Sequence, residues 1–280
     1  MASFPASPDQ VPLTSGNARV KEARKLARRS FRAEQRLFLV DGPKAVEGAL
    51  SVAGCVVEVF ATTAGTAAAT EKYPALAAAA PTWTLVDDRA LASLSDSVSP
   101  AGLVAVCRFL DRPLTHLLGP SSADPVGTRL VSICADVRDP GNAGTVVRTS
   151  DAAGADLVVF AGSSVDAYNP KTVRASVGSL FHLPIAVEAD PAVAVRTAQQ
   201  AGLTVLAADG AGELDLYDAD ELLARPTAWL FGNEAWGLPA ELAALADHRI
   251  RIPIHGRAES LNLSTAAALC LYASARAQRT

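Results

Sequence analysis

Polar residues of the kinds that bind and position charged ligands follow three apolar, strand-like runs in the second half of the chain. They form three groups: Asn142, Gly144 and Arg148; Gly232, Asn233, Glu234 and Gly237; and Glu259, Ser260 and Asn262. In open α/β sheets, ligands bind beside the carboxyl ends of the strands. We therefore expect the three groups to lie at such strand ends and to bind a small polar ligand.

The third group lies between a strand and a helix. Residues 250–254 form a strand with alternating isoleucines, residues 255–257 form a polar turn, and residues 266–273 form an apolar run. Ser260 and Asn262 precede this run and suit a helix N-cap, because their side chains accept hydrogen bonds from unpaired backbone amides. The helix is apolar on nearly every face, so we expect it to be buried. A strand end, a polar loop and a helix start together can hold a ligand.

Arg148 follows Asn142 by six residues, on a helix whose other residues are mostly small and apolar. Gly144 lets the start of this helix approach a neighbouring segment closely. Two interpretations of Arg148 stay open. It can pair with Asp139 or Asp151 at the surface, or it can direct its guanidinium at a bound anion or a reacting oxygen.

Two other charged positions are equally open. Glu234 lies in a loop between two glycines, where it is either an exposed carboxylate or the group that orients a partner while the backbone wraps a ligand. Lys171 and Arg174 open a helix after the strand 157–160, where they suit phosphate groups or an ordinary surface helix.

The order of apolar and helical segments predicts two α/β domains. The first domain, residues 15–110, has strands at 36–42, 55–60, 83–86 and 103–108, with helical segments between them. A stretch rich in Pro, Gly and Ser, residues 111–127, is typical of a linker. The second domain, residues 128–280, alternates strands and helices and therefore predicts a mostly parallel sheet. We expect residues 1–14 to form a loose tail.

Positive charge is concentrated near the N-terminus, although the chain as a whole carries a net charge of −4. Residues 19–36 contain 8 basic and 2 acidic residues, and residues 17–30 are predicted to form a helix. Clustered Lys and Arg can bind nucleic-acid phosphates, since binding releases counterions. A solvated helix face is the alternative. The candidate RNA-binding residues are Arg19, Lys21, Arg24, Lys25, Arg28 and Arg29, with Lys171 and Arg174 in the second domain.

Composition argues against several classes of protein. The four cysteines stand alone in apolar segments, which predicts buried free thiols, no zinc site and a reducing cytosol. We find no signal peptide and no apolar run near the roughly 18 residues of a membrane span. No G-x-G-x-x-G follows a strand, and no G-x-S-x-G is present, which argues against a dinucleotide enzyme and a serine hydrolase.

The three polar groups resemble, in the correct order, the three motifs of the SpoU/TrmH family of RNA 2′-O-ribose methyltransferases in the SPOUT superfamily. The motifs are N-x-G-x-x-x-R from Asn142, G-N-E-x-x-G-L from Gly232, and I-P-x-x-G-x-x-x-S-L-N-x-S-x-A from Ile252. In the first domain, K-L-x-x-R before R-x-F-L-V-D-G resembles the L30e-like substrate-binding domain of many rRNA-modifying members.

This resemblance implies a trefoil knot in the second domain, S-adenosylmethionine (AdoMet) bound in the knot, and a homodimer with its sites at the interface. It implies no metal. The polar positions it marks as catalytic are Asn142, Arg148, Glu234, Ser260 and Asn262. The positions it marks as cofactor-binding are Ala208, Gly232, Asn233, Gly237, Ile252, Ile254, Leu261, Leu263 and Ala266.

The implied reaction passes the sulfonium methyl of AdoMet to a ribose 2′-hydroxyl in the cytoplasm, with 23S ribosomal RNA favoured as the substrate. Alternatives are tRNA, or a catalytically silent protein that binds rRNA. The family proposal makes Arg148 the base, but an arginine side chain is hardly ever deprotonated at neutral pH. Arg148 can instead stabilise the developing alkoxide or grip the adjacent phosphate.

Overall fold

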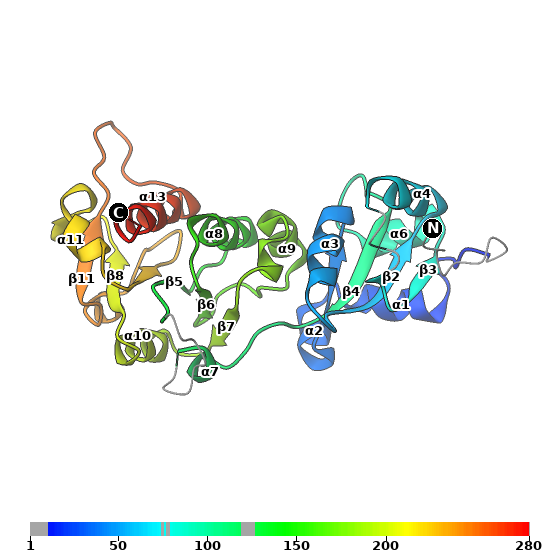
Figure 1. Ribbon diagram of the computed structural model, residues 1–280, viewed down its shortest axis with the longest axis horizontal. Coiled ribbons are helices and arrows are strands. Elements are labelled where there is room, and N and C mark those ends of the chain that lie inside the picture. Colours follow the sequence, from blue (N-terminus) through cyan, green and yellow to red (C-terminus); the bar gives the residue numbers. More distant parts are fainter. Residues whose placement is uncertain (1–10, 74–75, 77–78, 119–126, 280) are drawn as a thin grey trace. The chain divides into compact units, whose positions relative to one another are not determined.

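The computed structural model describes residues 11–73, 76, 79–118 and 127–279, and the chain divides into two compact units (Figure 1). The first unit contains the described residues up to Leu110 together with Tyr168–Phe181. The second contains the described parts of Asp111–Ala167 and His182–Thr280. The segment Tyr168–Phe181 therefore packs with the first unit, although it follows the second unit's first strands in the sequence.

The first unit is built on a four-stranded sheet in the order β1-β4-β2-β3. Strand β4 is antiparallel to β1 and β2, and β3 is parallel to β2. Its elements are α1 (Ala18–Lys25), α2 (Arg29–Gln35), β1 (Leu37–Asp41), α3 (Pro43–Ser51), β2 (Val56–Ala61), α4 (Thr63–Lys72), β3 (Trp83–Leu85), α6 (Asp88–Leu94), β4 (Leu103–Arg108), α9 (Pro170–Ser176) and the 3-10 helix η1 (Ser179–Phe181).

Helix α1 and the segment Tyr168–Phe181 cover opposite faces of this sheet. Val20 and Ala23 of α1 are buried in one cluster with Leu39 of β1. The ring of the adjacent residue Phe38 contacts the rings of Tyr168 and Phe181, at centroid distances of 4.7 and 6.3 Å. Because successive residues of a strand point to opposite faces, the two packing groups lie on different sides of β1.

The helix predicted over residues 17–30 is interrupted, which corrects that prediction. Helix α1 ends at Lys25 and α2 begins at Arg29. The cause is Arg32, which is only 2% exposed and donates from Nη1 to the carbonyl groups of Leu26 and Ala27, both at 2.8 Å. A buried guanidinium thus takes two carbonyls that a continuing helix would pair with its own amides.

The segment predicted as a loose tail is partly fixed. Residues 1–10 lie outside the described residues. Leu13 forms a parallel bridge with Val86, donates to the carbonyl of Leu85 at 2.8 Å and accepts from the amide of Asp87 at 3.0 Å. The chain is therefore anchored to the edge of the sheet before α1 begins. A single apolar residue such as Leu13 does not predict this bridge from the sequence.

The second unit contains a seven-stranded sheet in the order β7-β6-β5-β10-β8-β11-β9, and every strand pairing in it is parallel. This confirms the predicted parallel α/β architecture, while the trefoil knot stays a prediction. Its elements are α7 (Leu114–Leu118), β5 (Leu130–Ala135), α8 (Pro140–Ala153), β6 (Leu157–Ala161), β7 (Ile185–Glu188), α10 (Pro191–Gln200), β8 (Thr204–Ala208), β9 (Leu214–Asp215), η2 (Leu216–Asp218), α11 (Asp220–Leu223), β10 (Thr227–Phe231), α12 (Ala240–Ala243), β11 (His248–Arg251) and α13 (Leu263–Ala277).

Helices cover both faces of this sheet, with α8 and α13 side by side on one face and α7 and α10 on the other (Figure 1). Leu114 and Leu118 of α7 are buried in the core on that second face. Part of the segment expected as a linker is therefore a packed helix, because two leucines four residues apart supply an apolar stripe. Residues 119–126 of the same segment lie outside the described residues.

Helix α13 is less buried than its composition predicts. Ala267, Cys270 and Leu271 are buried, but Leu269 is 40% exposed and Tyr272 is 54% exposed. The helix is apolar all round, as expected, and among the described residues it packs on α8, α11 and the sheet. One apolar face of α13 therefore remains open.

Candidate functional site

A pocket of about 270 Å³ lies at the carboxyl ends of β8, β10 and β11. Its lining residues come from the ends of these strands, the loops that follow them and the start of α13: Ala208, Asp209, Gly210, Phe231, Gly232, Asn233, Glu234, Ala235, Gly237, Ile250, Ile252, Ile254, Glu259, Ser260, Leu261, Leu263 and Ala266. All nine residues predicted to bind a cofactor are among them. Parallel strands place their carboxyl ends at one edge, which is why segments far apart in the sequence meet here.

Glu234 ties the loop after β10 to the start of α8. Its carboxylate accepts hydrogen bonds from the backbone amides of Arg138 and Asp139, both at 3.0 Å, and from Nδ2 of Asn142 at 3.3 Å. Amides at a helix start have no partner within the helix and carry partial positive charge, so a carboxylate is a favourable partner. Nδ2 of Asn262 in turn donates to Oδ1 of Asn142 at 2.9 Å.

Asn262 connects this cluster to α13. Its Oδ1 accepts from the amides of Ser264 and Thr265, at 2.9 and 3.4 Å, and from the Ser264 hydroxyl at 2.7 Å. This is the N-cap that the sequence predicts. Asn142, Glu234 and Asn262 therefore form one hydrogen-bonded cluster, built from three separate parts of the chain.

The environment of Glu234 lowers its pKa below the ordinary value of 4.5: partial burial raises the pKa, but hydrogen bonds from the amides of Arg138, Glu234 itself and Asp139, and from Asn142, outweigh that effect. A carboxyl whose folded pKa is depressed stabilises the fold above its unfolded pKa and loses that contribution as pH falls through the folded value.

We predict that Glu234→Gln lowers the free energy of unfolding, and that the difference from the wild type is largest above pH 4.5. The difference should shrink as pH falls, since the wild-type carboxyl then becomes neutral as well. Urea unfolding of both proteins between pH 3 and 7 measures it. A difference that stays constant over this range would show that the charge of Glu234 is not what holds the start of α8.

The loop that carries Glu234 is fixed by its own backbone. Asn233 and Gly237 exchange two backbone hydrogen bonds of 2.9 Å, and Nδ2 of Asn233 donates to the carbonyl of Asp136 at 2.7 Å. Gly232 packs so closely on the other end of the loop that a Cβ there would lie 2.4 Å from the carbonyl carbon of Gly237. The close approach explains why a glycine occupies position 232.

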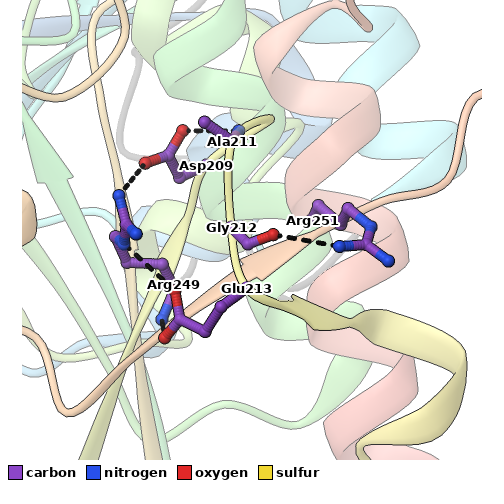
Figure 2. A network of polar contacts seen from close by, with 6 residues as sticks. All are labelled: Asp209, Ala211, Gly212, Glu213, Arg249 and Arg251. Atoms are coloured by element: carbon purple, nitrogen blue, oxygen red, sulfur yellow. Dashed lines mark hydrogen bonds and ion pairs between the residues drawn. The ribbon is translucent and has the colours of Figure 1, made fainter.

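A second polar network supports the loop that follows β8 (Figure 2). The backbone amide and Nε of Arg249 donate to the Glu213 carboxylate at 3.0 and 3.1 Å, and Arg249 also lies 3.7 Å from the carboxylate of Asp209. Arg251 donates to the carbonyl of Gly212 at 3.2 Å. These contacts bind the loop to β11, and so fix the Asp209 side of the pocket.

The five residues predicted as catalytic do not occupy equivalent places. Glu234 and Ser260 line the pocket, and Asn142 and Asn262 adjoin it through the Glu234 cluster. Arg148 is exposed on α8, does not line the pocket, and makes no hydrogen bond or ion pair within the part of the chain that the structure describes. The surface ion pair considered for Arg148 is therefore not formed.

The eight predicted RNA-binding residues all belong to the first unit. Arg19, Lys25 and Arg174 form ion pairs with Glu58, Glu22 and Asp96, respectively. Four of the others are exposed and form no ion pair with a described residue: Lys21, Arg24, Arg28 and Arg29. Lys171 and Arg174 lie on α9, across the sheet from α1, so the two predicted basic groups do not form one continuous helix surface.

Sequence reasoning did not assign several of the pocket residues a role. Asp209 and Gly210 directly follow β8, and Ala235 lies inside the loop of Glu234. Their position immediately after a parallel strand was a usable signal. Glu259, by contrast, belongs to the third polar group that the sequence predicts to bind a ligand, and it does line the pocket.

Comparison with known proteins agrees with this arrangement. The model of the SpoU rRNA methylase family matches residues 129–272, and that of the MRM3-like substrate binding domain matches residues 17–105. The chain belongs to the SpoU rRNA methylase family. Its second unit has the parallel α/β fold of SPOUT methyltransferases, and a substrate-binding domain precedes it.

Three relatives illustrate the similarity. The 23S rRNA (guanosine(2553)-2′-O)-methyltransferase of Bacillus subtilis is 30% identical over 259 residues, which cover 91% of this chain and 95% of that protein. The AdoMet-bound rRNA methyltransferase from Sinorhizobium meliloti is 32% identical with a TM-score of 0.81, covering 95% of this chain and 97% of that one. The SpoU methyltransferase AviRb from Streptomyces viridochromogenes, in complex with AdoMet, is 29% identical with a TM-score of 0.78, covering 93% and 97%.

Three further features concern the described residues. None of their helices combines the length and the apolar character that a membrane span requires. They contain no group of three or more His, Cys, Asp or Glu side chains placed to hold a metal ion. All four cysteines are buried and free, as predicted.

Proposed function

We propose that this protein transfers a methyl group from AdoMet to a ribose 2′-hydroxyl of 23S ribosomal RNA. The observation that carries the proposal is the position of the Asn142–Glu234–Asn262 cluster beside the strand-end pocket, because residues of all three family motifs meet there. The relatives support it by their activities, since the B. subtilis protein is a 23S rRNA 2′-O-methyltransferase and two of the solved structures contain AdoMet.

The pocket fits the cofactor in its chemistry. Ile252, Ile254 and Leu261 give it an apolar wall, and three carboxylates line it, from Asp209, Glu234 and Glu259. No Lys, Arg or His is among the lining residues. Such a site favours a ligand that carries positive charge. AdoMet has a positively charged sulfonium, and its methyl group is the electrophile that the reaction needs.

Residues of this chain would then hold the reactants and stabilise charge. The Asn142–Glu234–Asn262 cluster keeps α8, the loop after β10 and the start of α13 in fixed positions, and fixed positions of reacting groups lower the barrier to transfer. A guanidinium is a cation with hydrogen-bond donors and no acceptor, so we assign Arg148 electrostatic stabilisation of the developing 2′-alkoxide rather than the role of base.

A homodimer accounts for two features that a single chain leaves unexplained. Leu269 and Tyr272 expose apolar surface on α13, and α13 packs against α8, which carries the exposed Arg148. Exposed apolar faces of this kind are typical of interaction sites, and most soluble oligomers are symmetric homo-oligomers. We propose that two copies pair through α13 and that Arg148 of one copy serves the pocket of the other.

We expect the double variant Leu269→Asp, Tyr272→Asp to be a monomer and to lose most methyl transfer, because two buried charges would oppose pairing. Sedimentation velocity measures the state of assembly. Val193→Asp is the matched control, since Val193 is also an exposed apolar residue but lies on α10, on the other face of the sheet. If the Leu269→Asp, Tyr272→Asp double variant still sediments as a dimer, α13 is not part of the interface.

The RNA would be bound largely by the first unit. Four exposed side chains are available to phosphate groups: Lys21, Arg24, Arg28 and Arg29. When such side chains bind RNA phosphates, counterions are released from the RNA, and this release favours binding. Arg19, Lys25 and Arg174 would have to exchange a carboxylate partner for phosphate. The place of action we propose is the cytoplasm, which suits four free thiols and relatives that modify rRNA.

Methyl transfer from radiolabelled AdoMet to separate tRNA, small-subunit rRNA and large-subunit rRNA tests the proposal. We expect label in large-subunit rRNA only, and loss of that label in Asn142→Ala. Label in tRNA alone would show that the substrate is tRNA and not 23S rRNA. No label in any RNA or in ribosomal particles, with AdoMet binding shown by calorimetry, would favour a binding protein without the reaction.

A further inference from the structure

Trp236 is exposed in a way that the other tryptophans are not. It is 59% exposed, whereas Trp83 is 4% exposed and Trp229 is fully buried. Tryptophan is the largest side chain, and leaving it in water forfeits the free energy gained by burying apolar surface. An exposed tryptophan beside a binding pocket therefore suggests a partner molecule for its ring.

The backbone around Trp236 is held on both sides. Asn233 and Gly237 exchange two hydrogen bonds across the loop, and Oδ1 of Asn233 accepts from the amide of Ala235 at 2.8 Å. Glu234 is anchored to the start of α8. Because this loop is already ordered and an indole has only two side-chain torsions, fixing the ring on a partner costs little conformational entropy.

The ring lies outside the pocket rather than in it. Glu234, Ala235 and Gly237 line the pocket, but Trp236, which stands between them in the chain, does not. Ile254 and Leu261 of the pocket wall are also part-exposed, so apolar surface continues at the rim. The exposed indole therefore belongs to a loop that lines the pocket and is available to a molecule that approaches the pocket from solvent.

We propose that Trp236 stacks on an unpaired RNA base at or next to the ribose that is methylated. This inference rests on the proposed function, and it adds a residue that selects and positions the substrate. Protein–RNA recognition commonly splays single-stranded bases onto aromatic side chains. A base held in this way fixes the position of its ribose, so Trp236 would align the 2′-hydroxyl with the methyl donor.

Tryptophan fluorescence tests the contact directly. Trp236 is the only tryptophan of the chain that is exposed, so acrylamide quenching of the native protein reports mainly on this ring. We expect a large-subunit rRNA fragment that is a methylation substrate to reduce quenching, and a duplex of the same composition to have no such effect. Equal quenching with and without the substrate fragment, at RNA concentrations that saturate binding, would overturn the proposal.

Kinetics separate stacking from a structural role. Trp236→Ala should raise the KM for RNA roughly 5- to 150-fold, which corresponds to about 1–3 kcal/mol for one stacked base. Trp236→Phe should recover much of this loss, and AdoMet affinity measured by calorimetry should be unchanged in both. Tyr217→Ala is the control, because Tyr217 is 61% exposed on η2 and does not line the pocket.

The outcomes distinguish this inference from the function on which it rests. An active wild type with an unchanged KM for RNA in Trp236→Ala would overturn the stacking role and leave the methyltransferase proposal intact. A raised KM that accompanies dissociation to monomers in sedimentation would also overturn it, since the ring would then serve the dimer. A wild type that methylates no RNA would remove both proposals.

Discussion

Replacing Arg148 with alanine should lower methyl transfer to rRNA by about 10²–10³-fold, the effect typical of removing one group that stabilises transition-state charge. The affinity for AdoMet should not change, because the group that we propose Arg148 stabilises is the 2′-alkoxide of the RNA and not the cofactor. Single-turnover methyl transfer and calorimetry with AdoMet measure the two quantities. The protein should remain folded, since Arg148 is exposed and makes no hydrogen bond or ion pair within the described residues.

Two further variants refine this test. Arg148→Lys keeps the positive charge, so it should retain more activity than alanine if Arg148 acts electrostatically. Arg196→Ala removes an exposed arginine on α10 and should leave turnover unchanged. Full turnover in Arg148→Ala would remove Arg148 from the chemistry, and mixed dimers of Arg148→Ala with a pocket variant would show whether one copy serves the other.

Gly232→Ala should damage both the fold and the cofactor site. A Cβ at this position would lie 2.4 and 2.5 Å from the carbonyl carbon and oxygen of Gly237, and 2.7 Å from the amide nitrogen of Leu238. These are backbone atoms at a loop closed by two hydrogen bonds, so they cannot move aside cheaply. We expect the free energy of unfolding to fall by about 1–3 kcal/mol, as for other overpacked sites.

The affinity for AdoMet should fall more than tenfold in the same variant. A loss of about 1 kcal/mol in binding free energy already raises the Kd roughly fivefold, and several pocket residues would move together with the loop. Gly256→Ala is the matched control, because nothing lies within 4 Å of its Cβ position and it does not line the pocket. Normal AdoMet binding by Gly232→Ala would show that the loop after β10 is not part of the cofactor site.

The sequence predicts the second unit well because its signals are local and repeated. Each buried strand is followed by a polar loop, and parallel strands must bring those loops to one edge. This is why the three polar groups could be expected at one edge of the sheet. The assignment of Ala208, Gly232 and Ile252 to a cofactor site rested instead on the resemblance to the SpoU/TrmH motifs. Asn262 could be identified as an N-cap from the sequence itself, since the apolar run that follows it defines where the helix begins.

Other features depend on contacts that no local pattern contains. The break between α1 and α2 comes from Arg32. In the sequence Arg32 is one of many basic residues typical of a surface helix, but its side chain is buried and donates to two backbone carbonyl groups. The segment Tyr168–Phe181 joins the first unit through ring contacts with Phe38, which lies 130 residues before Tyr168. The open face of α13 was also not predictable. A helix sequence that is apolar on every side does not indicate which faces will be covered by the same chain.

The central claim is most directly tested by the position of the methyl group on the RNA. Large-subunit rRNA labelled by the wild type with radioactive AdoMet would be hydrolysed with alkali, which cleaves only next to a free 2′-hydroxyl. We predict that the label remains in a dinucleotide, since a 2′-O-methyl group blocks cleavage at that linkage, and that Asn142→Ala yields none. Label released in mononucleotides would place the methyl on a base and contradict ribose methylation.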